Sequence, residues 1–127
     1  MKNVTSQEFL AQFLNMRKPG GRVPEFLKSH RDATGRASTM SVLAKDVGYR
    51  HYKAMNLQYG RLAERIARAL GCPTQPGHVA MELLVEFVAP KGRSARHLSN
   101  DEYIVIMRPE FATALVAAGW IPEVKGA

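Results

Sequence analysis

The chain has 127 residues, of which 46% are hydrophobic and 23% charged, a balance that predicts one folded domain rather than a disordered tail. No apolar run approaches the roughly 20 residues that cross a bilayer, and the single cysteine, Cys72, excludes an intramolecular disulfide. A formal net charge of +7 and a pI near 9.9 favour a polyanionic partner, and the lack of a long apolar run argues against a membrane.

The first segment, MKNVTSQEF, predicts a capped helix. It lacks the apolar stretch of a secretory signal, so we expect a cytoplasmic protein. Thr5 and Glu8 have the spacing of a capping box, in which each side chain bonds a free backbone amide of the other residue. A first helix should therefore run from Thr5 to about Met16.

A second short helix and a basic loop are expected next. Pro24 is suited to the first turn of a helix that ends near His30. The following RDATGRAS is predicted to be a loop, whose Arg31 and Arg36 either contact phosphate or stay solvated. Basic residues outnumber acidic ones in this first third of the chain.

The stretch from Thr39 to Leu70 predicts two helices joined by a tight turn. Thr39 or Ser41 caps the first helix, and Gly48 ends it because glycine tolerates left-handed backbone. The small residue Ala44 in the first helix lets the second helix cross the first closely. The residues of this helix-turn-helix pattern are Leu43, Ala44, Val47 and Gly48.

In such a unit the second helix is presented to the DNA major groove. Here it is expected to open with side chains that suit phosphates and base edges, and Asn56 has the amide needed for a bidentate contact to adenine. The predicted DNA-binding residues of this segment are Tyr49, Arg50, His51, Tyr52, Lys53, Asn56 and Arg61.

After Gly48, two different sets of residues could form the buried face of the helix. The helix-turn-helix template buries Ala54 and Leu57. A single helix instead leaves Leu57 exposed and buries Tyr52, Met55, Tyr59, Leu62, Ile66 and Leu70. We favour a kink at Tyr59-Gly60, which would reconcile the two alternatives. A glycine inside a helix lowers helix stability by about 1 kcal/mol relative to alanine, so its presence there usually has a packing or functional reason.

After Gly71 the sequence predicts a hairpin. HVAMELLVEFVAP alternates apolar residues with Glu82 and Glu86, which is strand periodicity, and a second strand from Glu102 to Arg108 can pair with it. The connection between them carries a basic insert, KGRSARH. On this wing, flanking phosphate or the minor groove would be held by Lys91, Arg93 and Arg96.

A last helix should begin at Pro109 and end at Gly119, with Trp120 and Ile121 packing back onto the core. Together these elements predict an α+β fold of the winged helix-turn-helix type, with a two-stranded β-hairpin as the wing. One domain would span residues 1–127, divided into N-terminal helices and basic loop (1–37), helix-turn-helix (38–71), hairpin wing (78–108) and C-terminal helix (109–121).

Two runs of sequence resemble small bacterial domains associated with HNH-type restriction endonucleases. The first is GYRHYKAMNLQYGRLA, and the second is the ending built from MRPE (107–110), Ala114, Leu115, Gly119 and Trp120. The resemblance implies DNA binding in restriction, host defence or regulation, with a nuclease or another protein as a further partner. The helix-turn-helix part is also faintly similar to the DNA-binding part of alkylguanine alkyltransferases. The HNH histidine-asparagine pattern and the alkyltransferase Pro-Cys-His-Arg motif are both missing, so neither resemblance implies their chemistry.

Catalytic and metal-binding patterns are weak. No histidine has a metal-ligand partner at helical spacing, and Cys72 lacks a Cys-x-x-Cys companion and is expected to be a small buried hydrophobe. Glu82 and Glu86 are better explained as a solvated strand face than as paired catalytic carboxylates. The chain has no glycine-rich phosphate loop.

The sequence therefore predicts a noncatalytic protein that binds double-stranded DNA and uses no cofactor or metal. The alternative is a protein-docking adaptor or inhibitor of a nucleic-acid machine, with its basic surface facing an acidic protein. RNA binding is less favoured because no exposed Phe/Tyr pair at strand spacing supplies a stacking platform.

Overall fold

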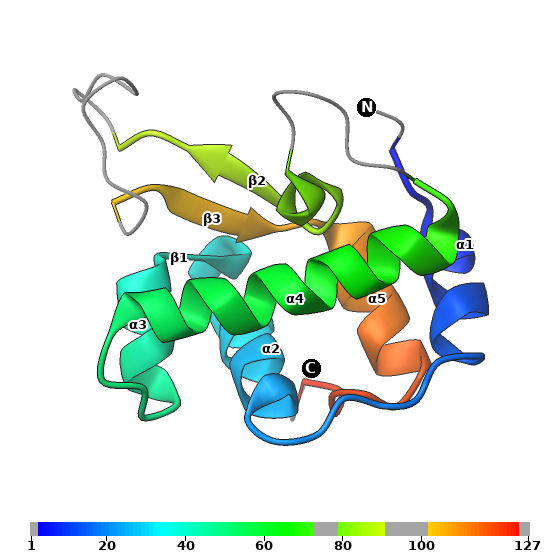
Figure 1. The fold of residues 1–127 in the computed structure, drawn as a ribbon, viewed down its shortest axis with the longest axis horizontal. Coiled ribbons are helices and arrows are strands. Elements are labelled where there is room, and N and C mark those ends of the chain that lie inside the picture. The colour runs from blue at the N-terminus through cyan, green and yellow to red at the C-terminus, as the bar shows by residue number, and fades with distance from the viewer. Residues whose placement is uncertain (1–2, 73–78, 91–101, 125–127) are drawn as a thin grey trace.

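The computed structural model describes residues 3–72, 79–90 and 102–124 (Figure 1). Within these ranges the chain has an α+β fold, in which a small antiparallel sheet lies with one face against the helices. The elements in chain order are α1 (Ser6–Phe13), α2 (Val23–Asp32), the 3-10 helix η1 (Thr34–Arg36), β1 (Ala37–Ser38), α3 (Met40–Asp46), α4 (Tyr52–Leu70), the 3-10 helix η2 (Ala80–Leu83), β2 (Val85–Val88), β3 (Ile104–Met107) and α5 (Pro109–Ala117).

The predicted pairing of the last two strands is confirmed. β2 and β3 are antiparallel, with Val85 opposite Met107 and Phe87 opposite Val105. The sheet order is β1-β3-β2, so β3 lies between the hairpin partner and a strand from the N-terminal half. Val85, Val105 and Met107 are buried, and they place one face of the sheet against the helices.

The prediction that RDATGRAS is a loop is wrong. It contains η1 and β1, and β1 pairs with β3 through Ala37 opposite Ile106. Both of its arginines bond distant backbone carbonyls, and Arg36 stays partly exposed. Arg31 is only 9% exposed and donates to the Pro122 carbonyl at 2.6 Å, while the Arg36 Nε donates to the Met107 carbonyl at 3.0 Å. These partners lie far along the chain, where local sequence gives no sign of them.

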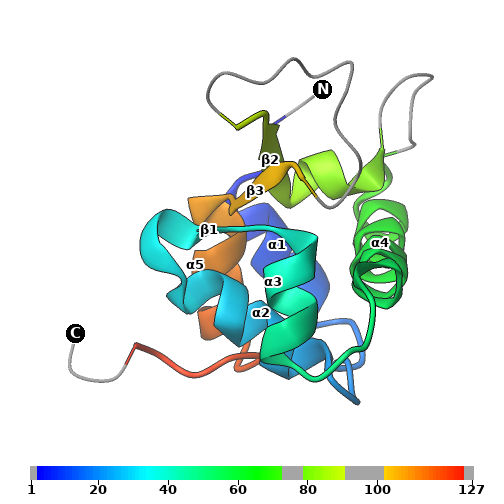
Figure 2. The same ribbon diagram turned by 90° about the vertical axis from the view of Figure 1, so that its left-hand side faces the viewer.

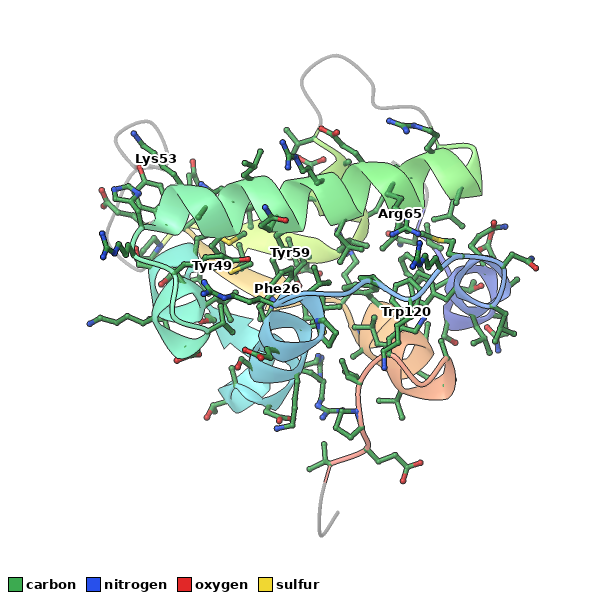
Figure 3. The ribbon with its side chains drawn as sticks, turned by 60° about the horizontal axis from the view of Figure 1, so that its bottom comes forward. Phe26, Tyr49, Lys53, Tyr59, Arg65 and Trp120 are labelled. Atoms are coloured by element: carbon green, nitrogen blue, oxygen red, sulfur yellow. The ribbon has the colours of Figure 1, made fainter. Side chains whose placement is uncertain are left out.

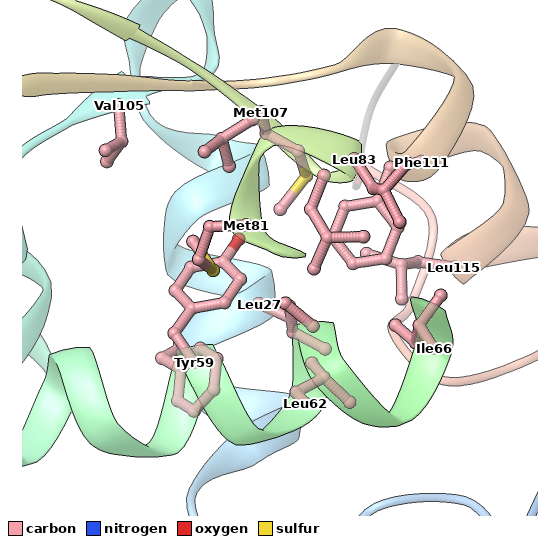
Figure 4. Packing of buried hydrophobic residues seen from close by; sticks show 14 of the residues in the cluster. Leu27, Tyr59, Leu62, Ile66, Met81, Leu83, Val105, Met107, Phe111 and Leu115 are labelled. Atoms are coloured by element: carbon pink, nitrogen blue, oxygen red, sulfur yellow. The ribbon is translucent and has the colours of Figure 1, made fainter. Parts of the chain in front are cut away.

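The strand expected from residue 79 onward is also wrong in its first half. Residues 80–83 form η2, and only 85–88 form a strand. The residues that alternate in the sequence are not buried alternately. Ala80, Met81 and Leu83 are buried, while Val79 is 53% exposed. η2 packs against α4 (Figure 4), so burial against that helix outweighs the local strand preference.

α4 is the longest element and lies along one side of the molecule (Figures 1 and 2). Its buried face meets η2, β3, α5 and α2 in one hydrophobic cluster (Figure 4). The labelled side chains of this cluster are Leu27, Tyr59, Leu62, Ile66, Met81, Leu83, Val105, Met107, Phe111 and Leu115. None of the helices within the described ranges has both the length and the apolar character to span a membrane.

The first and last helices pack against each other. The predicted capping box is present, with Thr5 and Glu8 bonding each other's backbone amides at 3.1 Å, although α1 ends at Phe13 rather than near Met16. Phe13 stacks on Trp120 with ring centroids 4.3 Å apart. Trp120 and Ile121 are buried, which confirms the prediction that they pack back onto the core.

Candidate nucleic-acid interface

The predicted helix pair is present as α3 and α4. Thr39 caps α3 by accepting a hydrogen bond from the Val42 amide at 3.2 Å. Gly48 has φ +81°, and the Tyr49 amide donates to the Ala44 carbonyl at 2.8 Å, which closes the end of α3. Leu43, Ala44 and Val47 are buried, as the pattern predicts. The left-handed residue at the turn is therefore the one that the sequence indicates.

α4 begins later than predicted. Its first residue is Tyr52, so Tyr49, Arg50 and His51 lie in the turn and not in the helix. His51 is the N-cap, and its Nδ1 accepts a hydrogen bond from the Lys53 amide at 3.1 Å. An exposed histidine thereby performs the capping that Ser or Asp usually provides, and no local preference of histidine signals this role.

The predicted kink at Tyr59-Gly60 is absent. α4 runs without interruption from Tyr52 to Leu70 and ends at Gly71, which has φ +67°. The single-helix phase is the one adopted, because it buries a continuous apolar stripe and leaves Leu57 51% exposed. Ala54, which the template would bury, is half-buried. The buried residues of α4 are Met55, Tyr59, Leu62, Ala63, Ile66 and Ala67.

The outward face of α4 carries three of the predicted DNA-binding side chains, those of Lys53, Asn56 and Arg61. Lys53, Leu57 and Arg61 follow one another at intervals of four residues and are exposed, and Asn56 lies beside them with partial exposure. Lys53 points away from the body of the molecule (Figure 3). Among the described residues neither Lys53 nor Arg61 forms an ion pair, so both cations are available to a partner.

The basic character continues to the end of the helix. Four basic residues and one acidic residue lie on α4, and they are Lys53, Arg61, Arg65, Arg68 and Glu64. Arg65 is partly engaged, because it donates to the Arg17 carbonyl at 3.0 Å across the α1 to α2 connection (Figure 3). Arg68 is exposed. We call the outward residues Lys53, Asn56, Leu57, Gly60 and Arg61 the α4 outer stripe.

Two of the predicted contact residues serve the fold instead. Tyr52 and Tyr49 are half-buried and pack against the hydrophobic core. The Arg22 guanidinium lies 4.7 Å from the centre of the Tyr49 ring, a cation-π contact with the segment before α2. Tyr52 also packs beside the His51 ring at 4.6 Å. Arg50, by contrast, is exposed at the turn next to the α4 outer stripe.

The wing residues fall outside the described part of the chain. β2 and β3 form the base of the predicted wing, but Lys91, Arg93 and Arg96 belong to residues 91–101. Their role as phosphate contacts therefore remains a prediction from the sequence.

A buried polar cluster joins three elements beneath α4. His30 is fully buried, with Nδ1 2.9 Å from the Tyr59 hydroxyl and Nε2 2.9 Å from the Val105 carbonyl. Since a carbonyl only accepts, Nε2 carries a proton. Burial favours the neutral ring, in which Nδ1 accepts from the Tyr59 hydroxyl. Burial lowers the pKa of His30, against the opposing effect of backbone hydrogen bonds with Val105 and Arg36, and burial also raises the pKa of Tyr59. This cluster fixes α4 to α2 and β3.

The remaining candidate catalytic or metal-binding residues are Cys72, Glu82 and Glu86. Cys72 is half-buried, and no group of three or more metal-ligating side chains occurs in the described ranges. Glu82 and Glu86 do not share a strand face, because Glu82 lies in η2. Arg108 links them by donating to the Glu82 carbonyl at 2.9 Å and to a Glu86 carboxylate oxygen at 3.4 Å.

Comparison with protein-family models, with curated proteins and with solved structures finds no match to this chain. The function is therefore inferred from the residues and charges of the chain itself.

Proposed function

We propose that this chain is a noncatalytic double-stranded DNA-binding domain of the winged-helix type, in which α4 enters the major groove. The observation that carries the proposal is the α4 outer stripe, where unpaired cations flank a side-chain amide on an exposed helix face. Lys53 and Arg61 suit phosphates, and Asn56 suits the N6 and N7 edge of adenine. A partner role in restriction or host defence follows from the sequence resemblance alone.

The placement of α4 supports this proposal. Its inner face is fully used by the core and by the Tyr59 hydrogen bond to His30, so the helix is a rigid support for the outer stripe. The β2–β3 hairpin follows α4 in the chain and pairs with β1, which precedes α3. A helix-turn-helix with an adjoining hairpin is the arrangement that the winged-helix proposal requires.

The experiment is a titration of short duplex DNA by fluorescence anisotropy at several salt concentrations. Affinity should fall steeply with salt, because binding releases cations from neutralised phosphates. Lys53→Ala and Arg61→Ala should each reduce the slope of log affinity against log salt by about 0.9 for the lost phosphate contact. Lys28→Ala is the matched control, since Lys28 lies on α2 and pairs with Asp32 at 3.0 Å.

Asn56→Ala should behave differently from the lysine and arginine variants. It removes no charge, so nonspecific affinity and salt slope should stay nearly constant, while preference for a selected site should fall by about 1 to 3 kcal/mol. Absence of duplex binding at low salt would refute the proposal. Salt-insensitive binding would point instead to the docking of a protein partner.

A further inference from the structure

Two residues of the α4 outer stripe have no explanation in the folded protein alone. Leu57 is 51% exposed on a helix that already buries a complete apolar face. Gly60 lies about one turn further along the same unkinked helix, although glycine destabilises helix interiors. A methyl group on Gly60 would meet no other side chain or distant backbone of the described structure within 4 Å. Neither a bend nor a close internal contact accounts for the glycine.

The two positions are connected by helix geometry. Side chains on a helix lean toward its N-terminus, so the side chain of residue 60 would lie over the turn that holds Asn56 and Leu57. Glycine at this position leaves the C-terminal flank of both side chains uncovered. The result is an accessible amide and an accessible isobutyl group side by side, between the cations of Lys53 and Arg61.

We infer that Leu57 contacts the 5-methyl group of a pyrimidine in the major groove, and that Gly60 leaves room for the base edge to approach. This rests on the proposed DNA binding. The charge of the stripe matches a polyanion, and the Asn56 amide matches adenine, whose partner thymine displays its methyl group in the same groove. The same methyl group occurs on 5-methylcytosine, so the recognised chemistry is a pyrimidine methyl near an adenine.

The test begins with a site enriched from random duplexes by the wild-type protein. Each thymine in that site is replaced in turn by deoxyuridine, which pairs identically but lacks the methyl group, and each cytosine by 5-methylcytosine. At one position near the adenine that Asn56 reads, loss of the methyl group should weaken wild-type binding about fourfold. A thymine-to-deoxyuridine effect identifies thymine, whereas a comparable gain with 5-methylcytosine identifies the modified base.

Leu57→Ala provides the coupled measurement. Because Leu57 is half-exposed and alanine favours helices, this variant should fold normally and bind methylated and unmethylated sites equally. Wild-type protein that binds its site but ignores the methyl group at every position would overturn this inference and leave the DNA-binding proposal intact. Failure of the wild type to bind any duplex would overturn both.

Gly60→Ala tests the second part of the inference. It should raise the melting temperature by about 4 °C through helix propensity, yet weaken binding to the methylated site severalfold. Ala69→Gly, at an exposed position near the end of α4, is the control and should lower the melting temperature without changing affinity. Unchanged affinity in Gly60→Ala would show that the base edge does not approach this position.

Discussion

At the scale of single residues, His30 links the stability of the fold to pH. Its imidazole is enclosed between Tyr59 and Val105, where burial favours the neutral form. Burial is the main cause that lowers its pKa below the ordinary value of 6.5. Below pH 6.5 the unfolded chain therefore binds a proton that the folded chain does not bind, and stability falls as the pH falls.

This predicts a measurable loss of stability on mild acidification. From about pH 6.5 downward, the free energy of unfolding should decrease by about 1.4 kcal/mol per pH unit until the folded-state pKa is reached. Urea denaturation at a series of pH values measures it. His30→Gln should be less stable at pH 7.5 but should show a flatter profile between pH 6.5 and 5. Identical profiles for the two proteins would refute the assignment to His30.

Gly48 gives a second prediction at this scale. With φ +81° and open space around it, the residue is constrained by its backbone conformation and not by crowding. Gly48→Val should therefore destabilise the protein by about 1 to 2 kcal/mol, because a Cβ disfavours left-handed backbone. Gly48→Asn, which tolerates this conformation, should lose less. Thermal melts compare the variants, and equal melting temperatures would contradict this explanation.

At the scale of elements, the sequence predicts those whose signals are local. The Thr5 to Glu8 capping box, the Gly48 turn and the start of α5 at Pro109 are set by residues close together in the chain, and all three are confirmed. The cationic stripe on α4 also follows from helical spacing. The exposure of Leu57 follows from the same periodicity if residues 52–70 form a single helix, whereas the helix-turn-helix template buries Leu57.

The elements that the sequence does not predict depend on distant partners. β1 exists because β3 pairs with it, and η2 replaces a strand because its apolar residues pack on α4. The His30 cluster joins residues 29 and 75 positions apart. No local pattern marks such contacts, because each side chain is compatible with several environments until the chain has folded.

At the scale of the whole molecule, one hydrophobic cluster includes residues of all five α-helices and of β2, β3 and η2 among the described residues. Trp120, the only tryptophan, is 4% exposed and stacks on Phe13 of α1. Its fluorescence therefore reports on the packing between the two ends of the chain. The helical signal in circular dichroism is weighted toward α4, the longest of the described helices.

The continuous core predicts that these two regions unfold together. Urea transitions followed by Trp120 fluorescence and by circular dichroism should have the same midpoint, as a two-state domain requires. Ile121→Val, which removes one buried methylene-sized group beside Trp120, should lower the unfolding free energy by about 1 kcal/mol by both probes. If the variant shifted only the fluorescence transition, the packing of α1, α5 and Trp120 would be a separate cooperative unit. The prediction that residues 1–127 form one domain would then be wrong.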